Sequence, residues 1–117
     1  MELRGVHHIS LNVDDVEAAT AFYTDVLGLT VRDDRPDFPF AGVWLDVGPQ
    51  QIHLIEAAVP TDTGQHVALQ VADIAAAVAD LRAQGITVSE PRPVVNVLQS
   101  FLHDPAGNRI ELDEVVG

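Results

Sequence analysis

The sequence predicts an α+β fold made of two βαβββ modules, and three observations support this prediction. A pattern occurs twice, 58 residues apart: His8–Val13 is repeated as His66–Val71, and Gln51–Leu54 as Arg109–Leu112. In both copies apolar and polar residues alternate, as in half-buried strands. Between these strands lie segments with apolar residues three and four positions apart, which is typical of helices that pack on a sheet.

The elements of the first module follow from this pattern and from the residues that interrupt it. Val6–Val13 is predicted as a strand, and Asp14-Asp15 can cap a helix from about Val16 to Leu27, which Gly28 ends. The module then continues with a short strand at Leu29–Arg32, a loop at Asp33–Phe40, a strand at Gly42–Val47, a turn at Gly48-Pro49 and a strand at Gln51–Glu56. Phe38 and Phe40 place aromatic side chains in the loop, which we expect to shape the mouth of a pocket.

The second module repeats this order after a linker rich in turn residues, Ala57–Gln65. Its predicted elements are a strand at His66–Val71, a helix from Asp73 to about Ala83 ended by Gly85, strands at Ile86–Ser89 and Val94–His103, a turn at Asp104–Gly107 and a strand at Asn108–Val115. Trp44–Gln51 matches Leu102–Arg109 at the same spacing, so the two hairpin turns are expected to coincide. We therefore predict one domain over residues 1–117, with modules at about 5–57 and 65–115 and a linker at 58–64.

Composition limits the classes of function. At 117 residues without cysteine, the chain has the length of one domain and neither disulfides nor thiolate ligands. No signal peptide and no apolar stretch near the ~18 residues of a membrane span are visible, so we expect a cytoplasmic protein that does not enter membranes. The net charge of −12, with arginine as the only basic residue type apart from histidine, argues against a nucleic-acid partner.

Strand parity gathers four side chains on one face of the sheets. Side chains alternate across a strand, so His8, His53, His66 and Glu111 all project from the face opposite the helix-packed apolar residues. If the two modules curl side by side, their mixed sheets form an open cup with helices outside and these four groups inside. Imidazoles with a carboxylate suit a divalent transition metal such as Zn, Ni, Co, Fe or Mn better than Mg or Ca. His53 could instead line the pocket without binding the metal.

Other conspicuous residues are expected to have structural roles. His7 has the parity of the core and is interpreted as a packed or edge histidine, and His103 has no counterpart in the repeat and is assigned no role. The large aromatic residues are expected in the core or the pocket wall: Phe22, Tyr23, Trp44 and Phe101.

Two stretches resemble a known superfamily. The run His8–Val16 with Ala21–Gly28, and the closing Asp104–Leu112, are similar to the vicinal oxygen chelate superfamily, which includes glyoxalase I, extradiol dioxygenases and bleomycin-binding proteins. The resemblance covers essentially the whole chain. It implies that His8, His66 and Glu111 are metal ligands, and that short members form homodimers in which two chains share each metal.

His53 departs from the resemblance, because lyase and epimerase members have Glu or Gln at the fourth ligand position. This removes a second carboxylate base and argues against glyoxalase I activity itself. We expect a metal-dependent glyoxalase-like lyase or isomerase that acts on a small oxygen-chelating substrate through an enolate, with Glu111 and His53 as catalytic residues. Two alternatives stay open: an Fe(II)-dependent extradiol-type dioxygenase that uses His8, His66 and Glu111, and a metal-free drug-binding protein of the bleomycin type.

Overall fold

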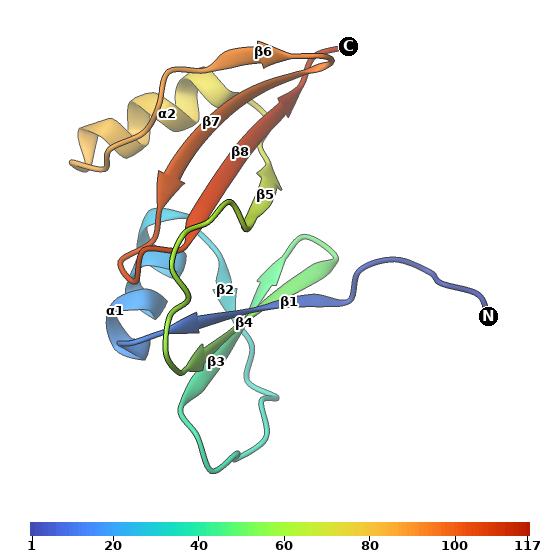
Figure 1. Ribbon diagram of the computed structural model, residues 1–117, viewed down its shortest axis with the longest axis vertical. Coiled ribbons are helices and arrows are strands. Elements are labelled where there is room, and N and C mark those ends of the chain that lie inside the picture. The colour runs from blue at the N-terminus through green and yellow to red at the C-terminus, as the bar shows by residue number, and fades with distance from the viewer. The chain divides into compact units, whose positions relative to one another are not determined.

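The computed structural model describes residues 1–117, which divide into two compact units of the same build (Figure 1). Unit 1 is Met1–Pro60 and unit 2 is Thr61–Gly117. Each unit contains an open four-stranded mixed sheet and a helix that packs on that sheet. The predicted α+β class, with a tandem strand and helix order, is confirmed. None of the helices is long and apolar enough to cross a membrane.

Unit 1 follows the predicted order closely. Its elements are β1 (His8–Val13), α1 (Val16–Ala21), η1 (Phe22–Val26), β2 (Thr30–Val31), β3 (Gly42–Val47) and β4 (Gln50–Glu56). The sheet order is β1-β4-β3-β2, with β1 parallel to β4. As predicted, the Asp15 side chain caps the helix by accepting from the Ala18 amide at 3.0 Å. The helix ends in a wide π-helical turn, and Gly28 follows it with φ of +79°, a conformation that suits glycine.

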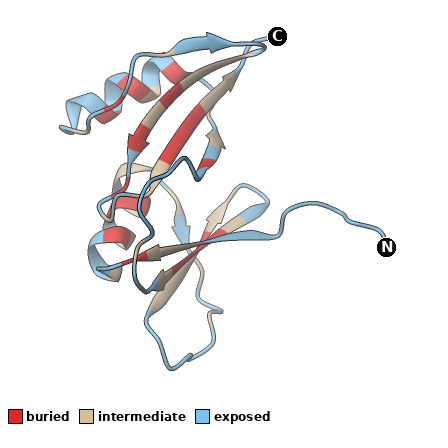
Figure 2. Cartoon of the chain, viewed as in Figure 1, coloured by how far each residue is buried: buried red, intermediate tan, exposed pale blue.

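Unit 2 repeats this topology. Its elements are β5 (His66–Gln70), α2 (Ile74–Ala83), β6 (Arg92–Val94), β7 (Val97–His103) and β8 (Arg109–Val115). The sheet order is β5-β8-β7-β6, with β5 parallel to β8. The Asp73 side chain caps α2 as Asp15 caps α1, and the Ala76 amide donates to it at 3.0 Å. Buried residues run along the central strands and the sheet-facing side of the helix in both units (Figure 2).

Two strand predictions in unit 2 are wrong. Ile86–Ser89 is not a strand, because the only backbone hydrogen bond that joins it to β7 runs from Ser89 to Phe101. The predicted strand Val94–His103 is interrupted by a turn at Val95 and Asn96, so its first residue belongs to β6 instead. Val95 has φ of +52°, which is unfavourable for a β-branched residue. A valine at this position therefore gives no indication of a turn in the sequence.

The repeat is also one residue out of step in the hairpins. Trp44 lies opposite His53, whereas the residue opposite Glu111 is Phe101. The structural counterpart of Trp44 is therefore Phe101 and not Leu102. Five residues separate His103 from its partner Arg109, whereas four separate Asp46 from its partner Gln51. Leu102 matches the buried Leu45 instead, and both are almost completely inaccessible.

Candidate functional site

The four predicted ligands form two pairs with the same backbone placement. In unit 1, His8 lies on β1 and His53 on the parallel neighbour β4, where His53 is the Cα partner of Ser10. In unit 2, His66 lies on β5 and Glu111 on β8, where Glu111 is the partner of Ala68. Each pair thus occupies a diagonal across a parallel strand pair, on the face away from the buried apolar residues. The repeat in the sequence corresponds to a repeat in side-chain placement.

The unit 2 pair is in direct contact. His66 Nε2 lies 3.1 Å from Glu111 Oε1, and His66 Nδ1 lies 2.7 Å from the Gly64 carbonyl oxygen. The carbonyl can only accept, so Nδ1 carries the proton and the tautomer is fixed. Glu111 is buried while His66 is exposed. The ring edge of Phe101 faces His66 with centroids 5.9 Å apart.

Asp113 lies two residues after Glu111 on the same strand face and was not singled out from the sequence. Burial, and then the neighbouring Glu111 carboxylate, raise the pKa of Asp113, while His66 opposes the shift. Its Oδ1 atom is buried without a hydrogen-bond partner. The period of two from Glu111 could have identified it, but its repeat counterpart is the apolar Ile55, so the repeat gave no signal.

The unit 1 pair is stacked. The rings of His8 and His53 are nearly parallel with centroids 4.0 Å apart, and Trp44 stacks on the other side at 4.3 Å from His53. His53 is 7% exposed, and its Nε2 lies 2.7 Å from Gln51 Oε1. Burial, then repulsion from positive charge on His8 and His7, lowers the pKa of His53, which favours the neutral ring.

The remaining two histidines lie outside the core. His7 was expected as a packed or edge histidine; it is exposed just before β1, and its Nδ1 lies 2.8 Å from His8 Nδ1. His103, which was assigned no role, contacts Asp62 at 3.1 Å. Asp62 also forms a two-point ion pair with Arg109 and accepts from the Gly64 amide. The bond from the Gly64 amide ties Asp62 to the turn whose carbonyl holds His66.

The donor chemistry of the four positions fits a transition metal, and the best fit is at His66 and Glu111. Metal bonds to imidazole nitrogen and carboxylate oxygen of about 2.0–2.2 Å put neighbouring ligand atoms about 3 Å apart, close to the separation of this pair. Neither unit alone groups three acidic or histidine side chains so that they could hold an ion. The structure brings the predicted ligands together as two pairs, His8 with His53 and His66 with Glu111.

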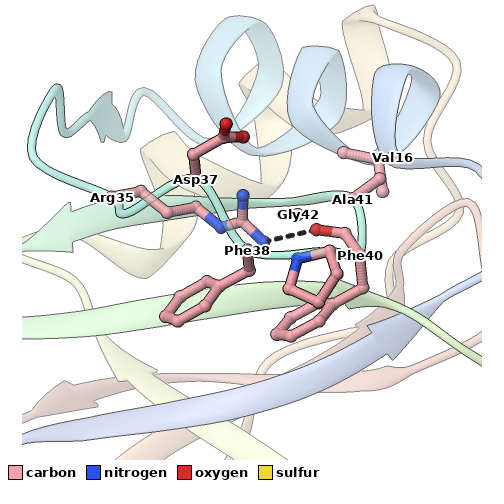
Figure 3. Close-up of a pocket in the computed structure, with 8 residues that line it drawn as sticks. Val16, Arg35, Asp37, Phe38, Phe40, Ala41 and Gly42 are labelled. Atoms are coloured by element: carbon pink, nitrogen blue, oxygen red, sulfur yellow. Dashed lines mark hydrogen bonds between the residues drawn. The ribbon is translucent and has the colours of Figure 1, made fainter.

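Unit 1 also contains two adjoining hollows in its surface. One has a volume of about 320 Å³, and its lining includes the stacked rings of His8, His53 and Trp44. The other, of about 490 Å³, is lined by the loop before β3 and is drawn in Figure 3. Arg35, Phe38 and Phe40 line both hollows. The expectation that the loop with these phenylalanines borders a pocket agrees with this placement.

Comparison with known proteins places the chain in a family. Residues 5–112 match the Glyoxalase/Bleomycin resistance protein/Dioxygenase superfamily. A lactoylglutathione lyase of Salmonella typhimurium is 31% identical over 121 residues, which cover 92% of this chain and 90% of the relative. A probable chloroplastic lactoylglutathione lyase of Arabidopsis thaliana is 30% identical, and the match covers only 36% of that longer protein. The crystal structure of a glyoxalase family protein from Bacillus anthracis superposes with a TM-score of 0.89, at 28% identity and 98% coverage of both chains.

Proposed function

Because the chain belongs to the glyoxalase, bleomycin resistance protein and dioxygenase superfamily, we propose that it is a metal-dependent lyase or isomerase. The proposed substrate is a small molecule with two neighbouring oxygen atoms, which reacts through an enolate. The proposed ligands of a divalent transition metal are His8, His53, His66 and Glu111. Glu111 and His53 are the proposed proton-transfer residues, and a homodimer is the proposed assembly.

The observation that carries this proposal is the contact between His66 and Glu111. Because His66 Nδ1 donates to the Gly64 carbonyl, the Nε2 of a neutral ring has a lone pair, and it faces a carboxylate oxygen at 3.1 Å. Two acceptors at this distance repel each other unless a proton or a metal ion lies between them. A histidine fixed in this tautomer by a backbone carbonyl is the usual form of a metal-binding imidazole.

The reaction assigns separate tasks to the side chains. A bound divalent ion would supply Lewis acidity toward the paired oxygens of the substrate. Glu111 takes a proton from the carbon next to the substrate carbonyl and returns it, which suits a buried carboxylate beside a second acidic group, Asp113. His53 is held neutral at physiological pH by its lowered pKa, so it can accept or share a proton without first losing one.

A metal-free binding protein is the second candidate, and one observation favours it. His53 Nε2 contacts Gln51 and its ring is stacked between His8 and Trp44, so it already has partners within unit 1. Such a stack is also a wall against which a flat ligand could lie. In this candidate the proton between His66 and Glu111 takes the place of the ion.

Metal analysis of the tag-free protein, after dialysis against a weak chelator, separates these candidates. We expect about one transition-metal ion per chain, with affinity that falls as histidine protonates below about pH 6. Nickel, cobalt or zinc would favour the lyase or isomerase, and iron would favour the dioxygenase. No binding after soaking with each ion would leave the binding protein.

The matched variants are His66→Ala and His103→Ala. Both histidines are exposed and lie on strands of the same sheet, but only His66 contacts Glu111. We expect His66→Ala to lose the bound metal and His103→Ala to keep it, with circular dichroism spectra like that of the parent protein. A full equivalent of tightly bound metal in His66→Ala would refute the ligand assignment.

A further inference from the structure

Most residues in the wall of the smaller hollow of unit 1 carry aromatic or imidazole rings. We call it the aromatic hollow; with a volume of about 320 Å³, it is lined by His7, His8, Arg35, Phe38, Phe40, Trp44, His53, Leu54 and Ile55. This volume is at the lower end of the range for ligand pockets, so it suits a small molecule. Its lining comes from β1, β3, β4 and the loop between β2 and β3, all within unit 1.

The rings of the aromatic hollow form two stacks. Trp44 stacks on His53, and Phe38 stacks on Phe40 with centroids 5.1 Å apart and an angle of 6°. Phe38 and Trp44 connect the stacks with centroids 6.3 Å apart. Phe38 and Phe40 are 38% and 44% exposed, although stacked phenylalanines would ordinarily be covered. Flat apolar surface is therefore available to a ligand.

Arg35 is the only cationic side chain of fixed charge at this hollow, and it has no acidic partner. Its guanidinium lies 5.1 Å and 5.4 Å from the ring centres of Phe38 and Phe40, and donates one hydrogen bond to the Phe40 carbonyl. Asp37 lines the larger hollow together with Arg35 (Figure 3), but no ion pair joins them. Four of the other arginines are ion-paired in this strongly acidic chain: Arg4, Arg32, Arg82 and Arg109. The remaining donors of Arg35 are free for an anion.

The backbone beside Arg35 leaves space for its side chain. A Cβ atom on Gly42 would lie 2.9 Å from Arg35 Nη2 and would also collide with the Leu54 carbonyl. Gly42 therefore allows the guanidinium to lie against the strand, over the phenyl rings. The guanidinium lies over the phenyl rings, and its hydrogen bond to the Phe40 carbonyl holds it there.

We propose that the aromatic hollow binds a small planar aromatic carboxylate, with its ring against Trp44 and Phe38 and its carboxylate on Arg35. Stacking selects the flat ring, and a charge-assisted hydrogen bond to guanidinium selects the anion. The further statement that such carboxylates are substrates of the enzyme rests on the proposed function. Binding itself requires only residues of unit 1 and no metal.

The test uses Trp44, the single tryptophan of the chain, as the reporter. Its indole N–H gives one isolated signal in a ¹H–¹⁵N spectrum of the full chain without added metal. Three probes are titrated: 1-naphthoate, its neutral amide 1-naphthamide, and the non-aromatic anion cyclohexanecarboxylate. We expect naphthoate to shift the signal at about tenfold lower concentration than either comparison probe, since it alone has both features.

Arg35→Gln should remove the tenfold preference for naphthoate over naphthamide and leave naphthamide binding unchanged. Arg92→Gln is the control, because Arg92 is also an arginine without an ion pair but lies on β6 in unit 2. Equal affinity for naphthoate and naphthamide, an unchanged preference in Arg35→Gln, or no shift with any probe would overturn the proposal. Metal content, measured on the same samples, reports independently on the proposed function.

Discussion

At the scale of single residues, the predicted ligands depend on neighbours that the repeat does not mark. His66 is oriented by the Gly64 carbonyl, and the Gly64 amide is in turn held by Asp62 at 3.1 Å. Arg109 forms an ion pair with the same carboxylate through both its Nε and its Nη2 atoms. Asp62 therefore acts on His66 through a short turn, as a positioning residue. Arg109 therefore binds Asp62, whereas its repeat counterpart Gln51 contacts His53 directly.

The charge of Asp62 should make stability depend on pH. Hydrogen bonds from His103 and the Gly64 amide, with Arg109 beside them, lower the pKa of Asp62. A carboxylate whose pKa is lower in the folded state stabilises it above its unfolded pKa of about 3.9, and this contribution is lost as pH falls further. We expect Asp62→Asn to unfold at lower urea concentration than the parent protein at pH 6, and the difference to shrink as the pH falls below about 3.9.

The control for this pH effect is Asp33→Asn, which removes a carboxylate that forms no ion pair. It should leave the urea midpoint unchanged across the same pH range. A difference between Asp62→Asn and the parent protein that stays constant from pH 6 to pH 3 would contradict the assignment of stability to the ionised carboxylate.

Residue-level prediction succeeded where a local rule determines the answer. The parity rule placed His8 and His53 on one face, and the repeat placed His66 and Glu111 at the equivalent positions. Gln51 and His53 are two positions apart on β4, so the period of two could have predicted their contact. The contact of Asp62 with Arg109 joins the linker to β8, and no local rule predicts it. For His7, parity left a packed or an edge position open, and the side chain is exposed because it lies just outside the first strand, where no further residues cover it.

At the scale of elements, the strands that were predicted correctly are those with regular alternation. His8–Val13 alternates strictly and forms β1, which begins two residues later than predicted. Gly42–Val47, where only Trp44 interrupts the alternation, forms β3 with the predicted bounds. Ile86–Ser89 has a similar composition but forms only one backbone hydrogen bond to β7. It is not a strand because it lacks pairing with a neighbour, although its residues favour strands. The turn at Val95 could not be predicted, because valine is among the residues least suited to a positive φ.

Strand β7 contains a mismatch that can be corrected. Ser100 is completely buried opposite Leu112, and its hydroxyl oxygen has no hydrogen-bond partner. An unsatisfied buried hydroxyl costs about 1–3 kcal/mol, so Ser100→Ala should raise the free energy of unfolding by about 1 kcal/mol after the small loss of packing.

Ser89→Ala is the matched opposite case, because the Ser89 hydroxyl accepts from the Phe101 amide at 2.8 Å. Its loss should lower the free energy of unfolding by about 0.5–1.5 kcal/mol. Urea denaturation of both variants beside the parent protein checks the two signs. A destabilised Ser100→Ala would show that the hydroxyl is satisfied in solution.

At the scale of the whole molecule, the chain contains two versions of one unit that have diverged in chemistry. Unit 1 has ring stacks and the unpaired Arg35, while unit 2 has carboxylates beside His66. In the proposed metal site, each unit would supply two of the four ligands. This division makes the question of which chains contribute to one site experimentally accessible.

If two chains of a homodimer share each metal, two inactive variants should complement each other. His8→Ala removes a proposed ligand of unit 1, and His66→Ala removes one of unit 2. Random mixing makes about half of the dimers mixed, and each mixed dimer regains one intact site in two, so metal content should return to about one quarter of the parent value. Each variant alone should stay empty.

Mixing should be done after dissociation and reassembly, with native mass spectrometry to confirm mixed dimers and metal analysis to count sites. A His8→Ala,His66→Ala double variant mixed with each single variant is the control. In each of these mixtures, either every unit 1 lacks His8 or every unit 2 lacks His66. No dimer can then form an intact site, so the mixtures should stay empty. Mixed dimers of the two single variants without metal would instead indicate that one chain supplies all its own ligands, because then no combination of the two restores a site.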